Sequence, residues 1–382
     1  NYPFALAPGM GLNAYMAFTV CGNMGYSWQI ALLAVFVEGL IFIVLSLTNV
    51  REAIFNAIPM ALKKGVSAGI GLFIAFIGLQ GANLVVNDDS TLLTYVKFVG
   101  DFHTIGIGAL LALIGLFIIV VLHHKNIKGS ILIGILATWI LGMICEAIGL
   151  YVPDGKDFYS LYPTFRMIDF GAFGTTFGQC FNVDFSGVDI LNFIAVLFAF
   201  LFVDIFDTLG TLIGVSTKAN MLDEEGKLPR IRPALLADAI ATSVGAIFGT
   251  STTTTYVESS AGVAAGGRTG LSAMVTGLLF LLAIVFAPIF TAIPSFATAP
   301  ALIFVGFLMI SSIISIDFED ITEAVPAYLA MLAMPLMYSI SEGIALGVIS
   351  YVVINLCCGK AKKIKPLMYI LTVLFVLKYI FL

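Results

Sequence analysis

Charged residues are scarce in this sequence. Asp, Glu, Lys and Arg make up 11% of its 382 residues and hydrophobic residues 60%, whereas roughly a quarter of a soluble globular protein is charged. This scarcity excludes a soluble globular domain. Apolar runs of the length that crosses a bilayer, about 17 to 25 residues, recur instead at 28–48, 65–86, 104–122, 129–149, 190–215, 232–249, 268–290, 298–316, 324–340, 343–357 and 366–382. The sequence therefore predicts an all-α polytopic membrane protein.

Metal-binding and redox motifs are also missing. The five cysteines show no metal or redox spacing, and the three histidines lie near the ends of apolar runs rather than at their centres. We see no nucleophile and base pair and no cofactor motif. We therefore expect no enzyme activity, no cofactor, no metal and no nucleic-acid partner.

The few basic residues are unevenly placed, and their placement predicts orientation. They gather at Arg51, Lys63 and Lys64, at Lys125 and Lys128, at Lys218, Lys227, Arg230 and Arg232, and at Lys360, Lys362, Lys363 and Lys365. These connections are expected in the cytoplasm. The loops at 87–102 and 150–189 carry more Asp than Lys or Arg and fall on the outer side.

A short peptide occurs twice. Residues 54–59 read IFNAIP and residues 289–294 read IFTAIP, and the same offset pairs 70–73 with 305–308. The basic connections put the first copy in the cytoplasm and the second outside. Equivalent peptides on opposite faces indicate an inverted-topology repeat, whose substrate site lies near the membrane midplane between interrupted helices.

Two stretches look like such interruptions. Residues 252–270, TTTTYVESSAGVAAGGRTG, predict a short extended segment followed by a half-helix near Glu258. Residues 1–15, NYPFALAPGMGLNAY, contain helix-breaking prolines and glycines, and a second half-helix is expected near Gly9 or Met10. The repeat spacing also suggests that two further transmembrane segments precede residue 1.

Intramembrane carboxylates are candidates for function, because a charged residue at a helix centre costs roughly 2.5–3.5 kcal/mol. Glu258 and Asp204 are expected to act on substrate or proton, with an N-cap role as the alternative for Glu258. Asp207 is expected to be structural. Asp238, Glu38 and Glu146 are expected to be hydrogen-bond partners or helix-end residues.

These motifs, together with FVDIFDTLGTLIGV at 202–215, resemble the guanine/hypoxanthine permease branch of the xanthine/uracil permease superfamily. The resemblance implies fourteen transmembrane segments in two inverted repeats of seven, with the first two segments outside this chain. It implies a core domain at 1–48 and 190–290, a gate domain at 62–150 and 298–357, and an extra C-terminal helix at 366–382.

The resemblance also implies a site. By motif position, Glu258 is the substrate-binding glutamate, Tyr256 and Val257 supply adjacent backbone, and Asp204 is the acidic residue of the eighth segment. Thr208 stands where some uracil transporters have histidine, and Met10 is expected to offer a backbone N–H. Glu258 and Asp204 are the expected proton-coupling residues.

The implied function is proton-coupled uptake of guanine and hypoxanthine, with adenine bound more weakly, across the cytoplasmic membrane. The expected partners are a purine nucleobase, a proton and the lipid bilayer, with a homodimer as a possible assembly. An anion transporter of the related sulfate-permease-like fold is the alternative, because two positive helix ends would also attract anions.

Overall fold

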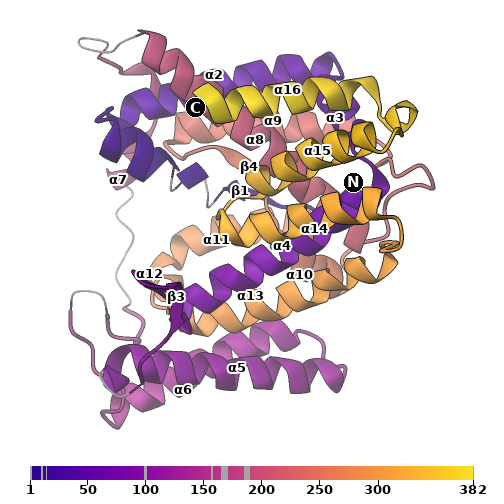
Figure 1. The fold of residues 1–382 in the computed structure, drawn as a ribbon. Coiled ribbons are helices and arrows are strands. Elements are labelled where there is room, and N and C mark those ends of the chain that lie inside the picture. The colour runs from indigo at the N-terminus through magenta and orange to yellow at the C-terminus, as the bar shows by residue number, and fades with distance from the viewer. Residues whose placement is uncertain are drawn as a thin grey trace.

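The computed structural model describes residues 2–9, 12–13, 15–98, 101–155, 158–164, 171–184 and 190–381. Helices dominate these residues, and two small antiparallel sheets accompany them (Figure 1). The longer helices are α2 (Trp28–Leu47), α4 (Met60–Gly81), α5 (Ile107–His124), α6 (Ser130–Ala147), α8 (Ile190–Lys218), α9 (Ile231–Phe248), α11 (Gly270–Val285), α13 (Ser295–Ile310), α14 (Ile321–Leu336), α15 (Ile340–Cys357) and α16 (Pro366–Phe381).

Shorter helical elements connect them. These are α3 (Val50–Ala57), η2 (Phe102–Gly106), α7 (Gly171–Thr176), η3 (Gln179–Phe181), α10 (Ser259–Ala264), α12 (Ala287–Phe290), η4 (Ser311–Ser315) and η5 (Ala361–Lys363). A hairpin of β2 (Val85–Asp88) and β3 (Leu92–Tyr95) lies in the predicted outer loop. Within the described residues, eight helices are long and apolar enough to cross a membrane, and α11, α14 and α16 are shorter apolar helices.

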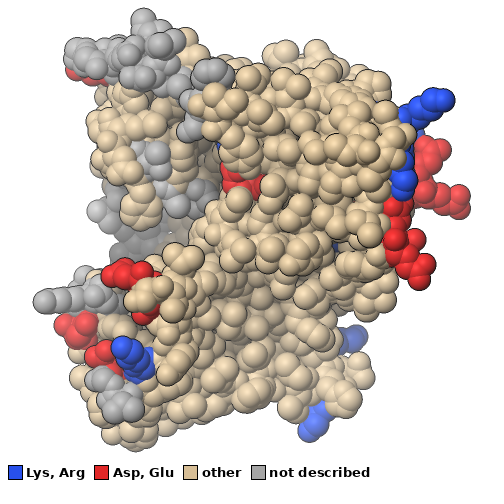
Figure 2. Space-filling model, in the orientation of Figure 1, with Lys and Arg blue, Asp and Glu red and all other residues tan. Residues whose placement is uncertain are grey.

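The surface agrees with a membrane-spanning chain. In Figure 2 most charged side chains on the visible face gather at two opposite edges, and a broad band of uncharged residues lies between them. Many large apolar side chains are exposed, including Leu279, Leu281 and Ile314 at 57%, 63% and 84%. Such exposure suits contact with lipid.

The predicted inverted repeat is visible where α4 and α13 cross. Pro59 and Pro294, the last residues of the two matching peptides, directly precede these helices. A Cβ built on Gly71 would lie 2.7 Å from the Gly306 carbonyl oxygen, and one on Gly306 would lie 2.4 Å from the Gly71 oxygen. These residues are equivalent in the repeat, so each helix meets its counterpart through the same position. The pseudo-two-fold axis passes near this contact.

The two interrupted segments also meet. Strand β1 (Leu6–Pro8) pairs with β4 (Thr253–Thr255) in antiparallel register, with Ala7 opposite Thr254. The pairing and the flanking bonds from the Gly9 amide to Thr252 O (3.1 Å) and from the Tyr256 amide to Ala5 O (2.8 Å) satisfy backbone groups that lipid would leave unpaired. After the breaks the chain forms α10 and a π-helix, η1 (Tyr15–Asn23). The predicted strand-then-half-helix pattern is confirmed for residues 252–264.

The helices pack in two groups. Helix α2 lies against α8 and α9, whereas α4 lies against α13 and α14, and α5 and α6 cover α13. Helix α8 contacts α4 and α15 and so joins the groups. Helix α16 packs on α15, and its Phe375 contacts Phe202 and Phe206 of α8.

Candidate substrate site

Glu258 lies in the connection between β4 and α10. Its Oε2 atom is buried and has no hydrogen-bond partner among the described residues. Its polar neighbour is the Tyr256 phenol. Because α10 packs against α8 and α13, this carboxyl group lies where the two helix groups meet. An unpaired carboxylate oxygen at such a junction can accept hydrogen bonds from a ligand.

The backbone around Glu258 is fixed from the other half of the molecule. The Ala5 amide donates to Ser259 Oγ (2.9 Å), and the Ala5 carbonyl accepts the Tyr256 amide (2.8 Å). Between these two bonds Val257 is buried in the main apolar cluster with Phe4 and Met309. The extended segment at the start of the chain therefore holds residues 256–259 in place.

Asp204 and Thr208 lie on α8, behind β4. Both side chains are fully buried. The Thr208 hydroxyl lies 3.3 Å from Asp204 Oδ1, 3.2 Å from Asp238 Oδ2 and 2.6 Å from Thr254 Oγ1. Asp204 Oδ2 is buried without a partner among the described residues. Thr208 thus links the acidic residue of α8 to the strand that leads to Glu258.

Asp238 of α9 forms a buried ion pair. Its Oδ2 lies 2.8 Å from Arg51 Nη2, and both side chains are 0% exposed. Arg51 also donates to the Leu235 carbonyl (3.1 Å) and stacks over the Phe42 ring. The prediction that Asp238 is an interhelical hydrogen-bond partner is confirmed. The sequence places Arg51 in a cytoplasmic connection and does not predict its burial, and the structure encloses its guanidinium within the α2–α3–α9 packing.

Glu38 of α2 is buried as well. Its Oε2 accepts from Thr252 Oγ1 (3.0 Å), while Oε1 has no partner among the described residues. Its charged neighbours are Asp204, Arg51 and Asp238. The bond to Thr252 confirms the predicted hydrogen-bonding role. At the outer end of α6, Glu146 accepts from Ser160 Oγ (2.7 Å) and the Leu161 amide (2.8 Å), as expected of a helix-end residue.

The predicted site residues therefore fall into two neighbouring sets. Tyr256, Val257 and Glu258 lie together at the break, and Asp204 with Thr208 lies in a deeper polar network. Thr254 connects them. Met10 lies outside the described residues. The sequence interpretation missed Arg51 as a member of the network, although an arginine within the amphipathic stretch VREAIF was a signal for it.

Comparison with known proteins identifies the family. The family model described as "Permease family", for xanthine/uracil permeases, matches residues 1–346. This chain belongs to that family. It is 48% identical to the guanine/hypoxanthine permease PbuG of Bacillus subtilis over 100% of this chain and 82% of PbuG. It is 40% identical to the adenine permease AdeQ of Escherichia coli over 100% of this chain and 81% of AdeQ.

The fold comparison agrees with an inverted-repeat permease. The transmembrane domain of the cyanobacterial bicarbonate transporter BicA matches 91% of this permease and 84% of its own chain, with a TM-score of 0.57 and 17% identity. At that identity the likeness concerns the fold, which has two inverted repeats of seven segments. The permease family and its nucleobase-transporting members do not favour the anion-transporter alternative. The chain is a multi-pass membrane protein of a transporter family, not an enzyme.

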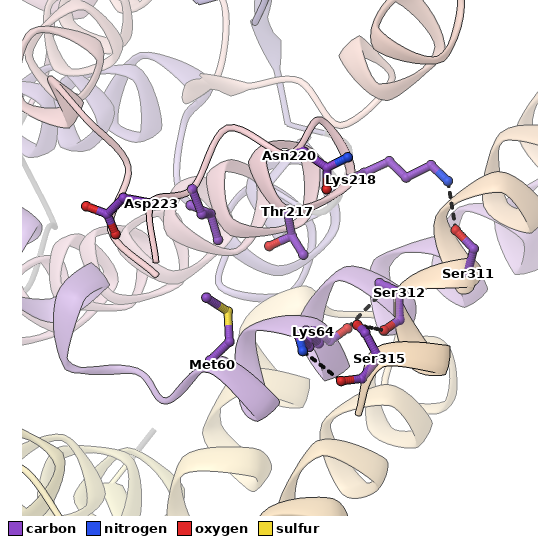
Figure 3. Close-up of a pocket in the computed structure, with 10 residues that line it drawn as sticks. Met60, Lys64, Thr217, Lys218, Asn220, Asp223, Ser311, Ser312 and Ser315 are labelled. Carbon is purple, nitrogen blue, oxygen red and sulfur yellow. Dashed lines mark hydrogen bonds between the residues drawn. The ribbon is translucent and has the colours of Figure 1, made fainter. Parts of the chain in front are cut away.

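A cavity of about 460 Å³ opens between the two helix groups on the side with the basic clusters. It is lined by the end of α8, the start of α4 and η4 (Figure 3). Lys218 of α8 donates to Ser311 Oγ (2.7 Å), and Lys64 of α4 donates to the Ser315 carbonyl (2.7 Å). The Lys218–Ser311 bond joins the two helix groups at this cavity, whereas the Lys64–Ser315 bond lies within the group of α4 and α13.

Proposed function

We propose that this permease takes up guanine and hypoxanthine together with protons, and that Glu258 holds the purine base. The observation that carries the proposal is the buried, unpartnered Oε2 of Glu258 at the break between β4 and α10. Membership of a nucleobase permease family supports the substrate class.

The pose follows from hydrogen-bonding chemistry. An ionised Glu258 accepts the N1–H and the exocyclic amine of guanine in bidentate fashion, and charge-assisted bonds of this kind are the strong ones. Hypoxanthine retains the N1–H. Adenine has none, so it should bind more weakly. Tyr256 and Val257, with a backbone N–H of Met10, complete the proposed contacts.

Proton coupling would make the uptake concentrative. We assign this role to Glu258 and to Asp204, the two buried carboxylates that the site and α8 provide. One proton per base, at about 2.3 kcal/mol per 100 mV and 1.4 kcal/mol per decade, would support roughly 50-fold accumulation at 100 mV.

Transport would proceed by alternating access, with a core domain (1–48 and 190–290) moving against a gate domain (62–150 and 298–357). Among the described residues, three hydrogen bonds span this proposed boundary on the basic side. They run from Lys218 to Ser311, from Ser67 Oγ to the Gly214 carbonyl (3.0 Å) and from Lys63 to the Gly226 carbonyl (2.5 Å). They would break and re-form as the core moves.

Competition during uptake tests the proposal. Cells expressing the permease receive labelled guanine or hypoxanthine, with excess unlabelled adenine, uracil, xanthine or sulfate, with and without a protonophore. We expect uptake that the protonophore abolishes and that guanine and hypoxanthine block but sulfate does not. Adenine competing as well as guanine would contradict the pose, and uptake of neither base would contradict the function.

A further inference from the structure

The network behind β4 contains more negative than positive groups. Glu38, Asp204 and Asp238 are all 0% exposed, and Arg51 is the cation that the described residues place among them. Full ionisation would leave two uncompensated negative charges away from water. Burying even one unpaired charge is strongly unfavourable. While the network is buried as it is in this structure, at least one of the three carboxyl groups therefore carries a proton.

Hydrogen-bond geometry shows which carboxylate is already compensated. Asp238 receives the Arg51 guanidinium at 2.8 Å and lies 3.4 Å from the Thr255 hydroxyl. Its charge is matched and its oxygens have donors. Asp238 is thus the residue of the three that has least need of a proton.

Asp204 and Glu38 are poorer in donors. Asp204 competes with Asp238 for the Thr208 hydroxyl, which has a single proton to give. Glu38 receives one donor, the Thr252 hydroxyl, and its Oε1 is unpartnered among the described residues. Neither has a guanidinium or ammonium in hydrogen-bond contact among these residues. The two are also charged neighbours of each other, so ionisation of one opposes ionisation of the other.

Glu38 is linked by hydrogen bonds to the place where the two interrupted segments pair. Thr252, its hydrogen-bond partner, accepts the Gly9 amide through its carbonyl (3.1 Å). Thr252 directly precedes β4, which ends three residues before Glu258. A protonated Glu38 can donate to Thr252 Oγ1, whereas an ionised one can only accept from it. The protonation state of Glu38 therefore sets the direction of its hydrogen bond with Thr252, next to the pairing of β1 with β4.

We propose that Glu38 binds the transported proton, at a position separate from the Glu258 carboxylate that receives the base, and that this assignment replaces the one made above to Glu258 and Asp204. The proposal deepens the proton-coupled uptake proposed above and rests on it. A proton from one side of the membrane converts the Glu38 carboxylate to the acid, with Asp204 as the neighbouring negative charge, and leaves to the other side after the core has moved. Glu258 can then remain ionised for the purine.

The test compares accumulation with exchange. The complete permease is reconstituted in proteoliposomes, and labelled hypoxanthine is supplied with a pH gradient or, without one, against internal unlabelled hypoxanthine. Glu38→Gln imitates the protonated side chain. We expect the variant to retain exchange within about threefold of wild type. Accumulation driven by a pH gradient equivalent to about 100 mV should fall from roughly 50-fold to about one. Glu225→Gln, on an exposed carboxylate paired with Lys227, is the matched control and should accumulate as wild type does.

Each other result has a defined meaning. Wild-type accumulation by Glu38→Gln would overturn the proposal, and so would loss of exchange in a folded variant, because Glu38 would then serve substrate movement itself. Failure of wild type to accumulate would contradict the proposed function instead. If wild type does not accumulate substrate, or if Glu38→Gln unfolds, the assignment of the proton to Glu38 is tested instead by infrared spectroscopy of wild type and of Thr252→Val. A protonated-carboxyl band at neutral pH that shifts when the Thr252 hydroxyl is removed supports the assignment, and an absent or unshifted band overturns it.

Discussion

The helices within the two groups are held together by different mixtures of contacts, although both groups include a close approach at glycine, such as that of Gly39 in α2 to Ser243 in α9. Around α2, α8 and α9, buried charged and hydroxyl side chains join the helices, as in Arg51 with Asp238 and Glu38 with Thr252. Around α4, α13 and α14, small residues let the backbones touch, as at Gly71 with Gly306 and Gly65 with Ala327. Lipid offers little hydrophobic drive between helices, so both polar bonds and small-residue packing are available solutions.

The difference has a functional consequence. Helices whose backbones are in direct contact fit together in one geometry, so these helices form a rigid body. In the polar network, the oxygen atoms that can accept a hydrogen bond outnumber the protons that can be donated to them. Such a network has alternative hydrogen-bond arrangements, and binding of a proton or a ligand can favour one of them. The region that is rich in carboxylates is thus suited to binding, and the region that is rich in glycine is suited to serve as its fixed support.

Glu258→Gln should have the largest effect on transport. The amide cannot accept both N–H groups of guanine, and loss of one partner of a desolvated charged hydrogen bond costs about 2–5 kcal/mol. We expect guanine uptake to fall at least about 30-fold, measured as initial rates at matched expression. Glu225→Gln serves again as the exposed control. Near-normal, pH-dependent uptake in Glu258→Gln would refute the assignment.

Arg51→Met should have the largest effect on stability in the polar region. It leaves Asp238 buried without its cation, a change that costs about 3–5 kcal/mol. The chain provides a matched control, because Arg232 and Glu52 form an exposed pair between the same two helices, α9 and α3. Arg232→Met should cost at most about 1 kcal/mol. The free energy of unfolding in detergent measures both effects. Equal losses of stability in the two variants would show that burial does not determine how much an ion pair stabilises the protein.

Much of this fold could be predicted from the sequence. Apolar runs located the long helices, since length and composition are local properties. The repeated peptide IFxAIP predicted the symmetry that Gly71 and Gly306 display, and the hydroxyl run at 251–255 predicted the break before Glu258. These features are encoded in adjacent residues, so no knowledge of packing was needed.

The site was harder to predict because it depends on contacts between distant segments. Arg51 reads as a loop residue in the cytoplasm, and its burial becomes visible only when α3 folds against α9. Glu38 and Asp204 are 166 positions apart in the chain, and no local pattern pairs them. The donor shortage of the network is likewise a property of the folded arrangement.

Gly71→Ala should destabilise the small-residue region by a moderate amount. The added methyl would lie 2.7 Å from the Gly306 oxygen and 2.8 Å from Met309 Cβ, so the helices must separate. Overpacking of this kind costs about 1–3 kcal/mol. Gly277→Ala in α11, where a Cβ meets nothing within 4 Å, is the control and should be neutral. The comparison of the two regions would fail if both variants unfolded alike.

Asp320→Ala should have the smallest effect, because this carboxylate lies outside the membrane-spanning segments and is solvated. Asp320 caps α14 by accepting from Thr322 Oγ1 (2.6 Å) and the Thr322 amide (3.0 Å), and it contacts Lys360 (3.1 Å). The Thr322 hydroxyl, followed by Lys360, holds the pKa of Asp320 below its usual range.

A lowered pKa in the folded state means that ionised Asp320 favours folding. This contribution is complete above the ordinary carboxyl pKa, about 3.9, and is lost as the pH falls through the lowered folded value. Thermal unfolding should therefore show a small loss for Asp320→Ala at pH 7 that shrinks as the pH falls below about 4. A deficit that grew on acidification would mean that the carboxylate does not stabilise α14 through its charge, and the contrast between solvated and buried charges in this permease would then need another explanation.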